Sequence, residues 1–418
     1  MIQTGQDMAS CTYLTRAQEY ALAVTIAVVT ANAYYIHPII GEVARSFGIG
    51  EGEIGIVPAL NQLALALGIL LLLPLGDRYS NRGLCLIFVS AQTICLLGMV
   101  LAANLAVFTA ASTLLGFFTI APYLIPAFAS KRVAPERLGQ VTALLTAGVI
   151  FGILVARMGA GIISEHAEWP IVYVCALVLM AGVTLFLPVA MRSDPAARKQ
   201  PATSYAGLVR SVFSLAASHP DMRLSALIQG LNFAMFTASW LALALHLTSR
   251  ELGYGTDSVG YLAGIAAISI ITTPRLGRWA DRVGARHARV AAALIQFAGT
   301  TLFYPLGSSI AGLVVPLVLV NIVGPTIDVT GRMTFLALAP EIRTRLTTFY
   351  IVVMFVGGAI GSALGTFVYD VGGWAGTCAM LLAMSGTVVS LSVLAERKWR
   401  RTAREWRPRR DSNARPSD

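Results

Sequence analysis

Charged residues are scarce in this chain of 418 residues. Only 12% of its residues are Asp, Glu, Lys or Arg, whereas 56% are hydrophobic, and the mean hydropathy is +0.70. A soluble globular domain carries about 25% charged residues. The composition therefore excludes an ordinary water-soluble protein and predicts that most of the chain lies within a lipid bilayer.

Cysteine pairs and catalytic motifs are also lacking. The five cysteines are odd in number and scattered, without a CxxC or His spacing typical of metal sites. We therefore expect no disulfide framework, no metal and no cofactor. The sequence has no zinc-protease motif, no P-loop and no Ser/His or Ser/Lys arrangement, so we expect neither an enzyme nor ATP hydrolysis.

Long hydrophobic runs are what the sequence does contain. A bilayer-spanning helix needs about 20 apolar residues, and runs that are continuously apolar rather than alternating favour helices over a barrel. We predict an all-α membrane protein with twelve transmembrane helices, at about residues 18–40, 54–75, 84–103, 105–129, 140–163, 171–190, 223–247, 258–276, 288–307, 310–335, 346–369 and 375–395.

The positive charges are distributed unevenly between the two sides of these spans. Nearly all of the 31 Lys and Arg residues fall in the N-terminal segment, the even-numbered loops and the C-terminal tail, whereas only Arg45 and Arg250 lie in the opposite loops. By the positive-inside rule, both termini are cytoplasmic in a multi-pass protein of the inner membrane. The net charge of +10 then reports topology and contact with membrane lipid, not nucleic-acid binding.

The two halves of the chain repeat each other. Asp77-Arg78 returns as Asp281-Arg282 at an offset of 204, and several other residues return at an offset of 205. Two matching halves in a membrane chain are typical of a transporter that works by alternating access. The residues that recur at 205 are Gly48, Gly55, Gly152 and Trp169, as Gly253, Gly260, Gly357 and Trp374.

This repeat divides the chain into two pseudo-symmetric six-helix bundles. We predict an N-terminal bundle at 1–191, a cytoplasmic linker at 192–222, a C-terminal bundle at 223–396 and a basic, disordered cytoplasmic tail at 397–418. Apolar residues from Tyr205 to Ala216 recur at helical spacing, which predicts an amphipathic helix on the inner leaflet. A disordered tether is the alternative for this linker.

Across residues 15–396 the chain resembles the major facilitator superfamily. Its loop signature is matched fully in the second half and partly in the first, where Leu73 and Ser80 occupy the glycine positions. The chain is also similar to bacterial efflux permeases for drugs or sugars, which carry Pro-Glu loops and a glycine-rich helix eleven. The residues that carry these resemblances are Gly277, Asp281, Arg282, Gly284 and Arg286, then Asp77, Arg78 and Arg82, then Glu136 and Glu341, and Gly357 to Ala363.

The charged loops are candidate gates. The repeat predicts that Asp77 faces the start of helix eleven and that Asp281 faces the start of helix five, where a carboxylate meets a helix N-terminus. Such contacts would hold the inner side closed. The alternative is that these residues only set topology. Glycines one turn apart, such as Gly148 and Gly152, predict close helix packing at the interface between the halves.

Three ionisable residues inside the spans are candidates for the transport pathway. Asp328 and Arg332 are four residues apart and able to pair, and Arg157 lies in helix five. Asp328 is the candidate proton or cation site, and either arginine is a candidate for holding an anionic or polyhydroxylated substrate. A purely structural ion pair is the alternative, and a neighbouring Arg favours the charged carboxylate.

Polar and aromatic residues add weaker candidates. Gln229, Asn232 and Trp240 follow one stripe of helix seven, which suits either a cavity wall or ordinary helix packing. His37 lies toward the outer end of helix one, where a solvated histidine is equally compatible with the sequence. The remaining candidates in the pathway are Asn32, Tyr35 and Tyr123.

The resemblance implies a secondary active transporter that works as a monomer on a small-molecule substrate. Export of a drug or sugar-like compound is favoured, with protons as the candidate coupling ion. An uptake permease and a non-transporting membrane sensor are the alternatives.

Overall fold

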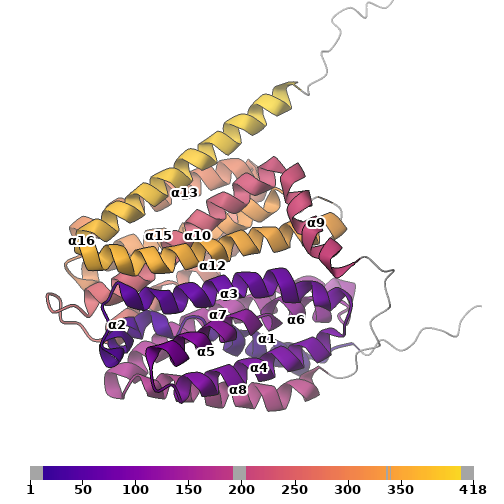
Figure 1. Ribbon diagram of the computed structural model, residues 1–418. Helices are drawn as coiled ribbons and strands as arrows, with labels where there is room; N and C mark the ends of the chain where they lie inside the picture. The colour runs from indigo at the N-terminus through magenta and orange to yellow at the C-terminus, as the bar shows by residue number, and fades with distance from the viewer. Residues whose placement is uncertain (1–12, 192–203, 336–337, 339, 406–418) are drawn as a thin grey trace, which may run out of the picture.

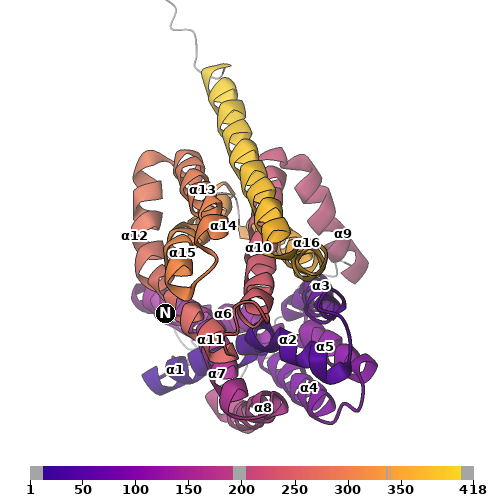
Figure 2. The same ribbon diagram turned by 90° about the vertical axis from the view of Figure 1, so that its left-hand side faces the viewer.

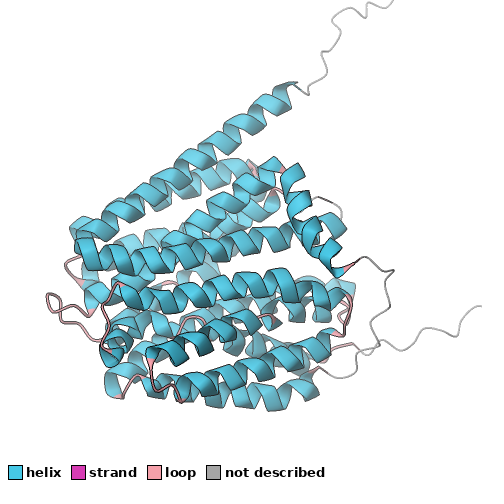
Figure 3. Ribbon diagram, in the orientation of Figure 1, coloured by secondary structure: helices cyan, strands magenta, loops and turns pink. Residues whose placement is uncertain are grey.

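The structure is a computed structural model that describes residues 13–191, 204–335, 338 and 340–405. Within these residues every regular element is a helix (Figure 3). The helices of the first half are α1 (Arg16–Ala31), α2 (Ile36–Phe47), α3 (Ile56–Leu72), α4 (Asn81–Val100), α5 (Leu105–Phe118), α6 (Ala121–Ser130), α7 (Leu138–His166) and α8 (Pro170–Ala190), with short 3-10 helices η1 (Glu53–Gly55), η2 (Leu73–Asp77) and η3 (Pro135–Arg137).

The second half follows a linker helix, α9 (Tyr205–Ser218). Its helices are α10 (Pro220–Leu247), α11 (Thr256–Ile265), α12 (Ile268–Val283), α13 (Ala285–Thr301), α14 (Phe303–Leu306), α15 (Ile310–Met333) and α16 (Pro340–Glu405).

The twelve predicted spans map onto these helices. Ten stretches of the described chain are long and apolar enough to cross a membrane. One of them, within α16, contains two spans, because its backbone leaves helical geometry at Gly373, where φ is +57° and ψ is −156°. The predicted ninth span is divided between α13 and α14, each of which is shorter than a full span. The prediction of an all-α membrane protein with twelve spans in two bundles is confirmed.

The first span is broken at its middle, and this break positions part of the candidate site. α1 ends at Ala31 and α2 begins at Ile36. The two helices still count as one membrane-crossing stretch from Arg16 to Phe47. The four residues between them, 32–35, include Asn32, Tyr34 and Tyr35, all of which are buried.

The two halves form two lobes that lie one above the other in Figure 1, the first from indigo to magenta and the second from pink to yellow. Glycines allow close packing inside each lobe. Gly148 lies against the backbone of Ala23 in α1, and Gly365 lies against the backbone of Ala238 in α10. The expectation that these glycines pack at the interface between the halves was therefore wrong for Gly148 and Gly152, which face α1 of their own lobe.

Both described chain ends lie at the same end of the bundles. The amide of Leu14 donates to the carbonyl of Arg132 in the loop after α6, and His287 in the first turn of α13 pairs with Glu396 near the end of α16. We call this the basic end, because the loops of Asp77 and Asp281 also lie there; it is on the right in Figure 1. The opposite end carries Gly48 and Gly253, with φ of 66° and 65°, so the repeat extends to backbone conformation.

The linker and the tail are partly described. Tyr205–Ser218 is helical, with Val212 and Ala216 buried and Phe213 exposed, whereas residues 192–203 lie outside the described residues. α16 continues to Glu405. Residues 397–405, which we expected to be disordered, are therefore helical, and residues 406–418 lie outside the described range.

Candidate functional site

The lobes meet through two pairs of helices at the opposite end. α3 packs against α16, and α7 packs against α11, as Figure 2 shows in a view onto this end. The two contacts are equivalent under the 205-residue repeat, because Gly55 faces Thr366 and Gly161 faces Gly260. The Thr366 hydroxyl donates to the carbonyl of Gly52 at 3.2 Å. The sequence repeat therefore corresponds to two equivalent contacts between the lobes.

A carboxylate accompanies each of these contacts. Glu165, at the end of α7, accepts hydrogen bonds from the Thr256 amide at 2.8 Å and from the Thr256 hydroxyl at 3.3 Å. These donors lie at the start of α11, where a helix favours negative charge. Asp370 in α16 occupies the equivalent position beside Gly52, just before η1. We call these contacts of Glu165, Thr256, Gly161, Thr366 and Asp370 the interlobe latch.

The predicted gating residues lie at the basic end. Their contacts are with residues of the same lobe or of the linker helix α9. The Arg82 guanidinium reaches the carbonyl of Pro188 at 3.5 Å, and Arg286 pairs with Asp221 at 3.2 Å. The guanidinium of Arg78 lies 5.9 Å from the ring centroid of Tyr205 in the linker helix.

Gly284 in this signature has φ of +94°, which explains the glycine there. Gly277 has open surroundings: a Cβ at this position would have one neighbouring atom, Val329 Cγ1, at 4.0 Å. Arg282 and Glu136 are exposed, and the side chain of Glu341 lies outside the described residues. Within the described part of the chain, Asp77 and Asp281 form no ion pair with the other lobe. Their predicted contacts belong to a state closed at this end and remain predictions.

Asp328 and Arg332 form the predicted pair on α15. The Arg332 Nε donates to both carboxylate oxygens, at 3.0 and 3.1 Å. Their side chains are 27% and 30% exposed although they lie within a membrane span. Tyr350 of α16 donates to the backbone carbonyl of Asp328 at 3.2 Å, and its ring lies 5.1 Å from the Arg332 guanidinium. The sequence analysis missed Tyr350, which no motif marks.

Arg157 and His37 form a second polar group, inside the first lobe. A guanidinium nitrogen of Arg157 lies 3.1 Å from His37 Nδ1. Arg157 is 2% exposed and His37 1% exposed. The solvated histidine considered for position 37 is therefore wrong, because the broken first span turns the ring inward.

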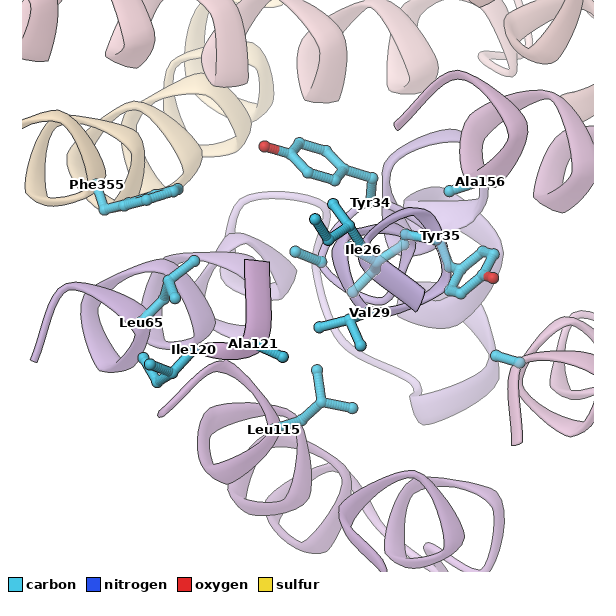
Figure 4. Packing of buried hydrophobic residues seen from close by; sticks show 14 of the residues in the cluster. Ile26, Val29, Tyr34, Tyr35, Leu65, Leu115, Ile120, Ala121, Ala156 and Phe355 are labelled. Atoms are coloured by element: carbon cyan, nitrogen blue, oxygen red, sulfur yellow. The ribbon is translucent and has the colours of Figure 1, made fainter. Parts of the chain in front are cut away.

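Aromatic rings from both lobes enclose Arg157. Its guanidinium carbon lies 5.2 Å from the Tyr34 ring of the first lobe, and 4.7 and 4.5 Å from the Phe236 and Trp240 rings of the second. Tyr34 and Tyr35, in the break between α1 and α2, point in different directions (Figure 4). Tyr34 therefore belongs to this group and Tyr35, the predicted residue, does not.

Tyr123 connects the two polar groups. It lies within electrostatic range of Tyr34 and of Asp328 and Arg332. Its ring also meets the ring of Phe355 in α16 edge to face, with centroids 6.5 Å apart. The structure thus brings Tyr123 to the boundary between the lobes, as expected for a pathway residue.

Gln229 and Asn232 face inward within the second lobe. The Asn232 amide donates to Gln229 at 3.1 Å, and Gln296 of α13 donates to Asn232 at 2.8 Å. This network supports the packing interpretation for the polar part of the helix-seven stripe, whereas Trp240 contacts Arg157. Asn32 is buried, and neither atom of its side-chain amide has a hydrogen-bond partner.

A separate cavity of about 590 Å³ lies between the start of α1 and the end of α8, lined by residues such as Tyr13, Ala17 and Val189. It touches none of the ionisable residues inside the spans. Among the described residues, no cluster of His, Cys, Asp and Glu could hold a metal ion.

The sequence profile of the Major Facilitator Superfamily matches residues 22–222 and 225–415, one match for each half. The chain belongs to the Major Facilitator Superfamily. It is therefore a membrane transporter by family, and the two matches coincide with the two lobes of the structure.

Relatives and a solved structure agree with this assignment. The chain is 27% identical over 373 residues to the uncharacterized transporter YgaY of Escherichia coli O157:H7, covering 88% of this chain and 92% of YgaY. It is 23% identical to the multidrug resistance protein MdtG of Klebsiella pneumoniae over 53% of this chain and 54% of MdtG. The fold is similar to that of the nucleoside transporter NupG, with a TM-score of 0.71, 15% identity, and coverage of 92% and 98% of the two chains.

Proposed function

We propose that this transporter is a monomer that exports a small organic compound across the cytoplasmic membrane by alternating access. The observation that carries the proposal is the asymmetry between the two ends. The lobes are joined by the interlobe latch at the opposite end, whereas Asp328 and Arg332, in the last turns of the span Ile310–Met333, each keep more than a quarter of their side-chain surface exposed.

The orientation follows from charge. With the basic end in the cytoplasm, the latch closes the outer side, and this conformation receives substrate from inside. The loops of Asp77 and Asp281 then close the inner side in the other state. The limits of the two bundles, 1–191 and 223–396, fit this rocking motion and remain predictions.

Proton coupling is assigned to Asp328. In this conformation Arg332 holds the carboxylate through two hydrogen bonds. A proton that neutralises Asp328 would release Arg332, and an arginine released in this way can bind another acceptor. The ion pair thus offers a physical link between proton binding and substrate binding. The similarity to MdtG, named for multidrug resistance, supports export.

Flux measured in oriented vesicles tests this proposal. Inverted membrane vesicles with an imposed pH gradient should accumulate the solute, and right-side-out vesicles should not. Accumulation only in right-side-out vesicles would show uptake, and no flux in either orientation for a broad solute panel would support a sensor.

A further inference from the structure

Arg157 carries a buried positive charge without a carboxylate. Its side chain is 2% exposed, and among the described residues its contacts are one histidine nitrogen and three aromatic rings. A buried charge is normally paired, because an uncompensated one costs much of its hydration free energy. Another fully buried arginine, Arg289, differs because Asp221 lies within electrostatic reach.

Among the described residues, the one hydrogen-bond acceptor that Arg157 has is a neutral histidine nitrogen. Because Arg157 donates to His37 Nδ1, that nitrogen accepts, and the ring proton lies on Nε2. His37 Nε2 and Arg157 Nε are both buried without a hydrogen-bond partner. An unpaired N–H on a positively charged guanidinium is complementary to an oxyanion.

The other neighbours of the Arg157 guanidinium are aromatic rings from both lobes. Phe236 and Trp240 belong to α10 of the second lobe, whereas Arg157 and Tyr34 belong to the first. Because the rings and the guanidinium belong to different lobes, movement of one lobe against the other would separate them. A planar guanidinium binds a carboxylate through two parallel hydrogen bonds and stacks on aromatic rings.

We infer that Arg157 and His37 form an anion-binding site that is covered in this conformation and is uncovered when the lobes move relative to each other, and that the transported compound is an aromatic carboxylate. The carboxylate pairs with the Arg157 guanidinium, and the aromatic ring of the compound takes the place of Phe236 or Trp240. This inference rests on the proposed transport function and names its substrate class.

Matched pairs of compounds test the inference on the purified full-length protein. The probes are benzoate, phenylacetate and indole-3-acetate, each paired with its neutral amide, and the readout is the shift in unfolding temperature. We expect at least one carboxylate to stabilise the protein at concentrations where its amide has no effect. In Arg157→Gln this stabilisation should be lost, and in Arg157→Lys it should weaken at least tenfold in apparent affinity, because a lysine lacks the planar fork.

Arg250→Gln is the control, since it removes a positive charge from an exposed loop at the opposite end. It should bind the carboxylates as the unmodified protein does. Equal stabilisation by acid and amide, or unchanged carboxylate binding in Arg157→Gln, would overturn the inference. If neither variant folds, the acid–amide comparison on the unmodified protein decides alone. Flux of neutral or cationic compounds only would refute the anion site while leaving the transport function intact.

Discussion

At the scale of the residue, the proposed mechanism makes Asp328 the group on which proton coupling depends. Its carboxylate is held by Arg332, and its backbone carbonyl by Tyr350. Asp328→Asn removes the titratable charge but keeps the shape and an acceptor oxygen. We expect pH-gradient-driven flux to fall to background, while stability changes by about 1 kcal/mol, as for a partly exposed ion pair.

Flux in proteoliposomes and the unfolding temperature check this prediction together. Glu168→Gln is the control, because Glu168 is an exposed residue of the loop between α7 and α8 and should leave flux unchanged. Undiminished gradient-driven flux in Asp328→Asn would remove Asp328 from the mechanism.

A second residue-scale prediction concerns the network of Gln229, Asn232 and Gln296. Gln296→Leu leaves the side-chain oxygen of Asn232 buried without its 2.8 Å donor. An unpaired buried acceptor costs about 1–3 kcal/mol, so the unfolding temperature should fall while substrate affinity stays the same.

Gln140→Leu is the control for loss of an amide, because Gln140 is exposed. It should change neither the unfolding temperature nor the substrate affinity. A large loss of affinity in Gln296→Leu, with unchanged stability, would show instead that this network belongs to the transport pathway.

At the scale of the element, closure depends on how closely α7 approaches α11. A Cβ at Gly161 would lie 2.5 Å from the carbonyl oxygen of Thr256 and 3.1 Å from the amide nitrogen of Gly260. Gly161→Val should therefore block the interlobe latch, trap the protein open at that end and abolish net flux while leaving it folded.

Gly159 provides the matched control, because a Cβ there meets nothing within 4 Å. Gly159→Val should transport normally. Labelling of a cysteine introduced in α11 by a membrane-impermeant thiol reagent measures the opening, and equal labelling in both valine variants would contradict the prediction.

At the scale of the whole molecule, the equilibrium between the two openings should depend on outer pH. Burial, with a further contribution from Asp370 of the other lobe, raises the pKa of Glu51 above its ordinary value of 4.5, against the opposing effect of Arg45. When the lobes part, Glu51 leaves Asp370 and its pKa returns toward the ordinary value. The closed state thus binds the proton more tightly, and closure strengthens as pH falls toward 4.5.

Accessibility of the same introduced cysteine, measured from about pH 7 downward, should decrease on acidification. In Glu51→Gln the protein should stay closed at all these pH values, whereas the exposed neighbour Glu53→Gln should keep the pH dependence. A rise in accessibility on acidification would show that the sign is wrong.

Much of the site could be predicted from local sequence rules. An i, i+4 spacing places Asp328 and Arg332 on one helix face, and the structure pairs them. By contrast, Tyr350 carries no distinguishing signal in a chain rich in apolar and aromatic residues. His37 could not be assigned, since its inward position depends on the helix break at residues 32–35.

The sequence by itself determined the number of spans, the twofold repeat and the asymmetry of charge, because hydrophobic length, internal similarity and loop charge are local properties of the chain. Only the tertiary structure decided which end is closed and what surrounds Arg157. Both depend on contacts between residues of different lobes, whose mutual position follows from packing of the whole molecule and changes between its states.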